Sequence, residues 1–427
     1  MKVLVIGAGG REHALVHALK KSEKIEQLFC APGNAGIDEE AKCVNIPVDD
    51  MEALLQFALN EKMDITVVGP EQPLTNGIVD LFQKNGLKIF GPSRAAARLE
   101  ASKSFTKDFC ARHNIPTAAY ETYTNSHAAL AALEGKKYPL VIKADGLAAG
   151  KGVIIAHSKL EAEDALKNML EDIVFGEAGK KVVIEEFLKG EEASFIVVSD
   201  GKHVLPLATS QDHKAIFDND EGPNTGGMGA YSPAPVVTSH IYDRIMHEII
   251  YPTIKGMQEE DSPFVGILYA GIMIVDGEPK LLEYNVRFGD PETQPILARL
   301  QSDFLSLVEY TLDAKLDQLE LKWDERPAVC VVMTSGGYPS MYERGKIITG
   351  IKQASELEDV MVYHSGTSKK DGEYLTSGGR VLSVTAIGNP LAVAIEKAYQ
   401  AVKKIRWEDC YYRKDIGMKA IKREHSH

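Results

Sequence analysis

The first hundred residues alternate short apolar runs with segments of helical pattern, and this alternation limits the folds open to the chain. The apolar runs have the length and composition of buried strands and lie at residues 2–6, 27–31, 65–68 and 87–90. Helical patterns lie between them, at residues 12–20, 51–60 and 78–85. Strands that alternate with helices favour an α/β fold built on a parallel sheet with right-handed crossovers.

Size and charge exclude several classes of protein. The chain has 427 residues, too many for one hydrophobic core and suited to about three or four domains. Its formal net charge of −13 argues against a nucleic-acid partner, because phosphate backbones need clustered Lys and Arg. A local basic pocket for ATP is compatible with this charge.

The cysteines and the hydropathy pattern favour the cytoplasm. The five cysteines are widely spaced and form no CxxC pair, so we expect reduced, buried thiols rather than disulfides or structural zinc. The opening residues, MKVLVIGAGG, lack the longer apolar run and cleavage site of a signal peptide. No stretch approaches the ~20 apolar residues of a membrane span.

A glycine turn at residues 7–12 follows a strand and begins a helix, as a dinucleotide-binding turn would. The dinucleotide fingerprint G-x-G-x-x-G needs its third glycine for close helix–strand packing, and Glu12 stands at that position. The second strand also lacks the terminal acid that would hold a ribose. A helix N-terminus with open amides beside Arg11 remains a good anion site. We expect the phosphate of another substrate here, with a structural turn or a dinucleotide as alternatives.

A second glycine turn, at residues 143–152, lies between two apolar strands and is not a P-loop, because Gly152 follows Lys151 where Ser or Thr is required. Its small residues let backbone N–H groups approach a polyphosphate closely. Lys143, at the end of the first strand, can reach the same phosphates. We expect a mobile flap, the alternative being an ordinary hairpin loop with a solvated lysine.

An apolar strand at residues 182–188 runs into two acids. Such a strand end can offer backbone groups to an adenine edge, while Glu185 and Glu192 reach the adenine amine or the ribose. Acidic strand ends are common, so a purely structural strand is the alternative.

Residues 281–292 contain a pattern typical of a metal-binding strand. Strand alternation is expected to place Glu283, Asn285 and Arg287 on one face of one strand. Two oxygen ligands two residues apart suit Mg²⁺, which keeps waters and takes its other ligands from phosphates. Arg287 beside them can neutralise charge on a transferred phosphoryl group. The alternative is a solvated strand face.

Two further segments, residues 211–214 and 222–230, lie between these elements. The second is too rich in glycine for a core element and is typical of a loop whose backbone approaches a ligand. His213 in the first fits a general base, although a lone histidine is more often structural.

Together these motifs resemble the ATP-grasp superfamily and, within it, the phosphoribosylamine–glycine ligase (glycinamide ribonucleotide synthetase) family. The resemblance covers essentially the whole chain. The Arg-Phe-Gly-Asp-Pro-Glu run at 287–292 is highly specific to that family, whereas the glycine loops alone identify only the superfamily. The segments that carry the resemblance are 5–13, 31–36, 68–71, 143–152, 211–214, 222–229 and 287–292.

The resemblance implies four domains and a reaction. It implies a Rossmann-like N-terminal domain at 1–100, an ATP-grasp lid at 117–190, a large lobe at 101–116 and 191–318, and a small α+β C-terminal domain at 326–427. The implied reaction joins glycine to 5-phosphoribosylamine through glycyl phosphate, giving glycinamide ribonucleotide, ADP and phosphate in de novo purine biosynthesis. ATP with Mg²⁺ or Mn²⁺ is the implied cofactor set.

The residues expected to serve this reaction fall into four groups. Arg287, Lys143 and Asp290 are expected in catalysis, and Glu283 and Asn285 in metal binding. ATP is expected to contact Lys103, Lys143, Gly150, Lys151, Gly152, Glu185, Glu186, Phe187, Leu188 and Glu192. Glycine and the amine are expected at Gly10, Arg11, Glu12, Asn34, Glu71, Asp212, Lys214, Asn224, Thr225, Gly226, Gly227, Asp290, Pro291 and Glu292.

Three rival functions stay open: another ATP-grasp ligase or carboxylase, a dinucleotide-dependent oxidoreductase, and a non-catalytic nucleotide-binding regulator. The incomplete fingerprint disfavours the second. The presence of phosphate, metal and lid elements together disfavours the third. We expect small-molecule substrates, no nucleic acid, no membrane and a monomer.

Overall fold

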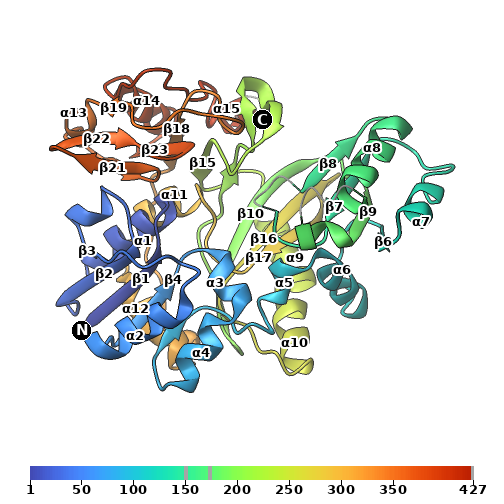
Figure 1. Ribbon diagram of the computed structural model, residues 1–427, viewed down its shortest axis with the longest axis horizontal. Coiled ribbons are helices and arrows are strands. Elements are labelled where there is room, and N and C mark those ends of the chain that lie inside the picture. Colours follow the sequence, from blue (N-terminus) through green and yellow to red (C-terminus); the bar gives the residue numbers. More distant parts are fainter. Residues whose placement is uncertain (149–151, 172–175, 425–427) are drawn as a thin grey trace.

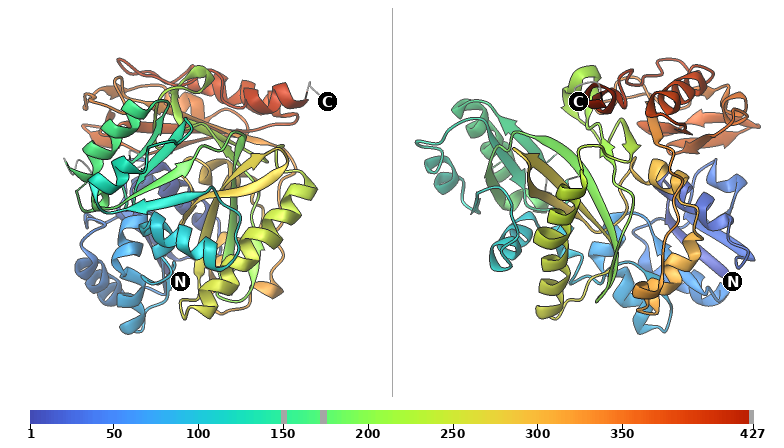
Figure 2. Two further views of the ribbon diagram at one scale, coloured as in Figure 1. Left: turned by 90° about the vertical axis from the view of Figure 1, so that its right-hand side faces the viewer. Right: turned by 180° about the vertical axis from the view of Figure 1, so that it is seen from behind.

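The structure is a computed structural model that describes residues 1–148, 152–171 and 176–424. Its N-terminal and C-terminal parts lie together at one side of the molecule, and a small lobe projects at the other (Figure 1). The view from behind shows the central strands between them (Figure 2). No helix among the described residues is long and apolar enough to cross a membrane.

The N-terminal part is a five-stranded sheet in the order β3-β2-β1-β4-β5, and every pairing in it is parallel. The expected parallel sheet is therefore confirmed, although β5 is shorter than expected and helix α3 was not foreseen. The strands are β1 (Lys2–Gly7), β2 (Gln27–Pro32), β3 (Lys42–Cys43), β4 (Ile65–Val68) and β5 (Ile89–Phe90). The helices are α1 (Gly10–Lys20), α2 (Met51–Glu61), α3 (Glu71–Asn76) and α4 (Ile78–Lys84).

The small lobe is an antiparallel sheet in the order β6-β9-β7-β8, with two helices. Strands β7 and β8 form an antiparallel hairpin across the glycine turn, and Lys143 pairs with Val153 at the end next to that turn. The elements are β6 (Tyr120–Tyr123), α7 (Ser126–Ala131), β7 (Leu140–Ala144), β8 (Val153–Ala156), α8 (Lys159–Leu170) and β9 (Val182–Glu186).

The central part is an antiparallel sheet in the order β11-β10-β16-β17. Its strands are β10 (Glu191–Asp200), β11 (Val204–Pro206), β16 (Val265–Val275) and β17 (Glu278–Asn285). Its helices are α5 (Arg98–Ala101), α6 (Lys103–Arg112), α9 (Ser239–Ile245), a π-helical turn (Met246–Ile250), α10 (Tyr251–Glu259), α11 (Thr293–Arg299) and α12 (Phe304–Leu312).

Helices α5 and α6 are separate elements that meet at Ser102. Ser102 has extended backbone angles, and its hydroxyl accepts a hydrogen bond from the N–H of Phe105. A serine in that position is a helix N-cap, so it ends α5 and begins α6.

The C-terminal sheet takes in strands from the middle of the chain. Its order is β12-β15-β18-β23-β20, and β15 pairs antiparallel with β18. Its strands are β12 (Gln211–Asp212), β15 (Gly229–Ser232), β18 (Ala328–Thr334), β20 (Val360–His364) and β23 (Arg380–Ile387). Around it lie β13 (Ala215–Phe217), β14 (Glu221–Asn224), β19 (Ile347–Ile348), β21 (Thr367–Lys370), β22 (Glu373–Thr376), α13 (Ile351–Ser355), α14 (Leu391–Val402) and α15 (Met418–Glu424).

This pairing corrects the loop expected at residues 222–230, because only 225–228 lie outside strands β14 and β15. It also places residues 211–232 beside the C-terminal strands. The expected division into four domains stays a prediction.

The N-terminal and central sheets share their hydrophobic cores. Leu4 packs in one buried cluster with Phe195, and Val3, on the opposite face of β1, packs in another with Ile196. The small lobe differs, because its core cluster contains only residues between Ala129 and Ile184. The lobe is therefore packed as a unit of its own.

Leu166→Ala should destabilise the small lobe alone. Leu166 is fully buried in the lobe's core, and its truncation is expected to cost about 2–5 kcal/mol. Leu160, on the same helix α8, is 67% exposed, so Leu160→Ala is the matched control. Hydrogen exchange should show faster exchange in β7 and β9 in Leu166→Ala only, with β1 and β18 unchanged. Faster exchange throughout the chain would contradict a separately packed lobe.

Candidate active site

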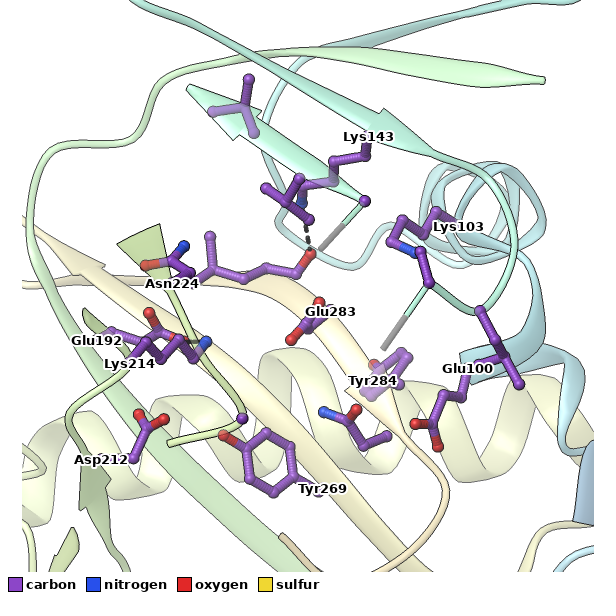
Figure 3. Close-up of a pocket in the computed structure, with 18 of the residues that line it drawn as sticks. Glu100, Lys103, Lys143, Glu192, Asp212, Lys214, Asn224, Tyr269, Glu283 and Tyr284 are labelled. Atoms are coloured by element: carbon purple, nitrogen blue, oxygen red, sulfur yellow. Dashed lines mark hydrogen bonds and ion pairs between the residues drawn. The ribbon is translucent and has the colours of Figure 1, made fainter. Parts of the chain in front are cut away.

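One cavity of about 560 Å³ lies between all parts of the chain. The N-terminal part contributes Arg11 to its lining, the small lobe Lys143, the central sheet Glu283 and the C-terminal part Arg380. Figure 3 shows Glu283 between Lys143 and Lys103 on one side and the Glu192–Lys214 pair on the other.

Glu283 and Asn285 lie at the end of β17 and both line the cavity, as strand alternation requires. Burial raises the pKa of the Glu283 carboxyl, but Lys214, Lys143, Lys103 and Arg287 outweigh it and hold the pKa below its ordinary value. The carboxylate is therefore charged. The described residues hold no group of three or more His, Cys, Asp or Glu side chains able to bind a metal. A carboxylate and an amide oxygen alone fit Mg²⁺, which fills its shell with water and phosphate.

The expected position of Arg287 on the same strand face is wrong. β17 ends at Asn285, and the chain bends away where the N–H of Val286 donates to Glu100. The guanidinium nevertheless returns to the cavity, because Nη2 donates to Asn285 Oδ1 at 3.0 Å and Nε pairs with Glu71 at 3.2 Å. Burial raises the pKa of Glu71, but Arg287 and Arg11 lower it to about 2.

Lys143 is held by a buried ion-pair chain. Glu185 lies 2.9 Å from the Lys143 ammonium and 3.0 Å from that of Lys107, and all three side chains are less than a tenth exposed. Glu185 stays a predicted ATP residue. Its carboxylate, however, faces two lysines, so in this structure it positions Lys143.

Lys214 stands among three carboxylates, Glu192, Asp212 and Glu283. It forms an ion pair with Glu192, and Asp212 and Glu283 add to the negative surroundings that raise its pKa against the effect of burial. Burial, with Glu292 and Glu192, raises the pKa of Asp212 well above its ordinary value, while Lys214 opposes the rise. The cluster places the Lys214 cation beside a carboxyl whose pKa is raised.

The remaining predicted ATP residues lie on the side of the cavity away from Lys214. Lys103 donates to the carbonyl of Gly146 at 3.1 Å. The cavity is also lined by Gly152, Glu186, Phe187 and Leu188. Gly150 and Lys151 lie outside the described residues.

The N-terminal turn is closed, contrary to the open amides that the sequence predicted. Glu12 accepts from the N–H of Gly9 at 2.6 Å and from Arg11 Nε at 2.6 Å, and it is 2% exposed. Arg11 also donates to the carbonyl of Phe288, and Gly10 packs against Gln294. The carboxylate of Glu12 therefore occupies the position predicted for a substrate anion.

Other predicted substrate residues divide into two groups. Asn34 uses its side chain within the protein, since Nδ2 donates to Ala8 and His364 and Oδ1 accepts from Gly36 and Ile37. Gly227 and Pro291 pack on one another, because a Cβ at Gly227 would lie 2.4 Å from the proline ring. The cavity is lined by Glu71, Asp212, Lys214, Asn224, Thr225, Gly226, Asp290 and Glu292.

His213 favours the structural alternative. It is 1% exposed, does not line the cavity, and has no hydrogen-bond partner on either ring nitrogen among the described residues. Burial lowers its pKa to about 4, so the ring is neutral at neutral pH.

Sequence reasoning missed several lining residues, among them Glu100, Lys107, Tyr338 and Arg380. The Tyr338 hydroxyl accepts from the N–H of Gly226 at 3.1 Å, and Arg380 donates to the carbonyls of Gly226 and Asp290. The paired glycines before Arg380 were the available signal of a close backbone approach. Nothing in the sequence showed which loop they approach.

Family models and relatives match along nearly the whole chain. The matching models are described as phosphoribosylglycinamide synthetase N domain (residues 1–100), ATP-grasp (A) domain (101–293) and C domain (328–419). A phosphoribosylamine–glycine ligase of Vibrio vulnificus is 56% identical over 427 residues, covering 99% of each chain. One of Escherichia coli K12 is 56% identical over 428 residues, covering 99% of this chain and 100% of the other. The crystal structure of one from Thermotoga maritima has a TM-score of 0.83 at 34% identity, covering 97% and 100%.

The fold and these matches define an ATP-grasp ligase, an enzyme that uses ATP. Within that class, the chain belongs to the phosphoribosylglycinamide synthetase family. The expected fold and family are thereby confirmed.

Glu185→Gln should destabilise the protein strongly, because it leaves Lys107 and Lys143 buried without a carboxylate. Breaking a buried pair in this way is expected to cost about 3–5 kcal/mol in the free energy of unfolding. Glu186→Gln, at the exposed neighbouring position, should stay within about 0.5 kcal/mol of wild type.

The loss in the free energy of unfolding caused by Glu185→Gln should become smaller as the pH rises. Burial already lowers the pKa of Lys107, and Glu185 opposes that fall. Without the Glu185 carboxylate, the pKa of Lys107 in the folded state falls further. The folded state then binds fewer protons than the unfolded chain over a wider pH range, so the stability of the variant rises with pH. Urea unfolding from about pH 7 to about pH 9 measures this, and a constant deficit would contradict the ion-pair assignment.

Proposed function

We propose that this chain joins glycine to 5-phosphoribosylamine at the expense of ATP, through glycyl phosphate, and releases glycinamide ribonucleotide, ADP and phosphate. The observation that carries the proposal is the convergence of Glu283 and Asn285 with three lysines, Lys103, Lys143 and Lys214, in one cavity. The family and the named relatives support the choice of substrates.

We assign the triphosphate to the space between the small lobe and β17. Lys103 and Lys143 face it from the α6 and β7 side, and backbone groups of 185–188 offer hydrogen bonds to the adenine edge. Glu283 and Asn285 are the residues that would hold Mg²⁺ or Mn²⁺. When bound there, the divalent ion withdraws charge from the phosphoryl oxygens.

A carboxylate does not react with an amine at neutral pH, because its leaving group would be oxide. Attack of the glycine carboxylate on the γ-phosphate forms a C–O–P linkage and releases ADP, and the amine then displaces phosphate. Lys143 and Arg287 stabilise the charge that develops on the transferred phosphoryl group. The small lobe excludes water, which would hydrolyse glycyl phosphate.

Glycine and the reacting amine are placed at the wall opposite the adenine. Its polar groups are Asp212, Lys214, the 224–227 loop, Asp290 and Glu292. Burial, with Glu292 and Glu192, raises the pKa of Asp212, which favours its hydrogen-bond-donating form relative to an ordinary aspartate. Asp290 is charged, because Arg380 and Arg11 offset the effect of burial and lower its pKa.

We also propose that the enzyme works as a monomer in the cytoplasm. All five cysteines are free, as in a reducing compartment.

Glu283→Gln should abolish most metal-dependent turnover, since it removes the charged ligand and leaves an isosteric amide. We expect kcat for ADP formation with glycine and phosphoribosylamine to fall by roughly 100-fold or more, with a higher metal requirement. Glu278→Gln, on the same strand β17 but 59% exposed, is the matched control and should retain wild-type rates. A wild-type rate and metal dependence in Glu283→Gln would refute the metal assignment.

Wild-type ADP release should require glycine and phosphoribosylamine together. A coupled ADP assay over candidate acids and amines separates this reaction from other ATP-grasp chemistry. Equal ADP release with a different acid or amine would favour the rival ligase.

A further inference from the structure

Asp145 directly follows strand β7 of the small lobe and is bound to the start of helix α6 in the central part. Its Oδ1 accepts from the N–H of Ser104 at 2.6 Å, and its two carboxylate oxygens lie 3.2 and 3.0 Å from the Ser102 hydroxyl, which donates to them. The backbone carbonyl of Asp145 accepts from the N–H of Lys103 at 3.0 Å. One residue of the small lobe therefore binds three consecutive residues of the central part.

These contacts complete the hydrogen bonding at the N-terminus of α6. A helix leaves its first N–H groups without partners inside the helix. The first two N–H groups of α6, those of Lys103 and Ser104, donate to Asp145, and the third donates to the Ser102 hydroxyl. The first turn of α6, which the structure describes in full, contains no acidic residue. The negative charge that stabilises a helix N-terminus is therefore supplied by Asp145, from another part of the chain.

The same contacts link the two lysines that face the proposed triphosphate. Lys143 lies two residues before Asp145 on β7, and Lys103 is the first residue of α6. The Lys103 ammonium also donates to the carbonyl of Gly146, the residue after Asp145, at 3.1 Å. Figure 3 shows both lysines on the same side of Glu283. Both line the cavity and Asp145 does not, so Asp145 acts on a bound phosphate only through these lysines.

A second link strengthens the contact between the small lobe and α6. The N–H of Asp145 donates to the carbonyl of Lys181 at 3.0 Å, and the Lys181 ammonium donates to the Ser104 hydroxyl at 3.2 Å. This junction differs from the buried ion pair of Glu185, which holds the ammonium end of Lys143. Asp145 instead fixes the backbone from which the lysine side chain extends.

We propose that Asp145 is a positioning residue for ATP, whose carboxylate holds Lys143 and Lys103 at the spacing that the triphosphate requires. The inference rests on the proposed function, which assigns the triphosphate to these lysines. Without the carboxylate, the two lysines are in place in only a fraction of the molecules, and the affinity for ATP falls by that fraction. Binding of the adenosine end, assigned to the backbone of residues 185–188, does not depend on the junction.

The test compares ATP with adenosine as ligands, by calorimetry in the presence of Mg²⁺ and without glycine or amine. Asp145→Ala should lose roughly 10- to 100-fold of the wild-type preference for ATP, because it removes hydrogen bonds to a charged acceptor. Asp145→Asn keeps an acceptor for the N–H of Ser104 but loses the charge, so it should lose roughly 2- to 5-fold. Asp164→Ala, at an exposed acid on helix α8 of the same lobe, is the control and should keep the wild-type preference.

A double variant tests whether the carboxylate acts through the contact with α6. Ser102→Gly removes the hydroxyl but leaves a residue that is tolerated at a helix N-cap. The ATP preference of Ser102→Gly/Asp145→Ala should be no lower than that of Asp145→Ala alone, because the hydroxyl then has no carboxylate to bind. Losses that add in the double variant would show two independent roles and would contradict the inference.

Kinetics separate positioning from a general loss of structure. KM for ATP should rise in Asp145→Ala, while KM for glycine stays within about twofold of wild type. A wild-type preference for ATP in the Asp145 variants overturns the inference, and Asp145→Asn, which preserves the side-chain shape, decides the matter if Asp145→Ala does not fold. Absence of ADP release by wild type with glycine and phosphoribosylamine would overturn the proposed function but not this inference, because ATP binding is measured without them.

Discussion

The Glu185 carboxylate lies in the interior between two ammonium groups, and the geometry of the cavity depends on that contact. Lys143 comes from β7 and Lys107 from α6, so one carboxylate on β9 joins the small lobe to the helix beneath it. Two ammonium groups against one carboxylate leave an excess of positive charge in a site of low dielectric. Leaving buried charge unbalanced costs several kcal/mol, so the site favours the arrival of a polyphosphate.

The positions of the two predicted metal ligands, Glu283 and Asn285, follow from strand register. Glu283 lies opposite Gly271 on β16, next to a bulge, and Asn285 lies opposite Tyr269. Both side chains thus point from one face of the central sheet toward the small lobe. The fourfold cationic surroundings keep Glu283 ionised, which is the form that a divalent cation requires. Strand geometry therefore brings Glu283 and Asn285 together, and the surrounding cations keep Glu283 in the form that binds a metal.

Local patterns in the sequence were sufficient for the strands, the hairpin and the Glu283–Asn285 pair. Each depends on alternation or turn chemistry within a few residues, as in β7, whose glycine turn was recognised from composition alone. The prediction that Arg287 lies on the strand was wrong, because Glu100, far away in the chain, accepts from the N–H of Val286 where the strand ends. The prediction of open amides at Gly9 was wrong, because the Glu12 side chain binds the N–H of Gly9 in a capping box.

Arg380 shows why the rest could not be read locally. It reaches the Gly226 loop because β15 pairs with β18 and β18 with β23, which brings Arg380 to a loop 154 residues earlier in the chain. No periodicity within either segment encodes that pairing. The same pairing has a chemical consequence for the proposed reaction. In the proposed reaction the amine lies at the wall of Asp212, Lys214, the 224–227 loop, Asp290 and Glu292, none of which belongs to the small lobe, whereas the phosphates lie against that lobe with its separate core. A lobe with a core of its own suits the closure over ATP that the proposed reaction, with its water-sensitive intermediate, requires.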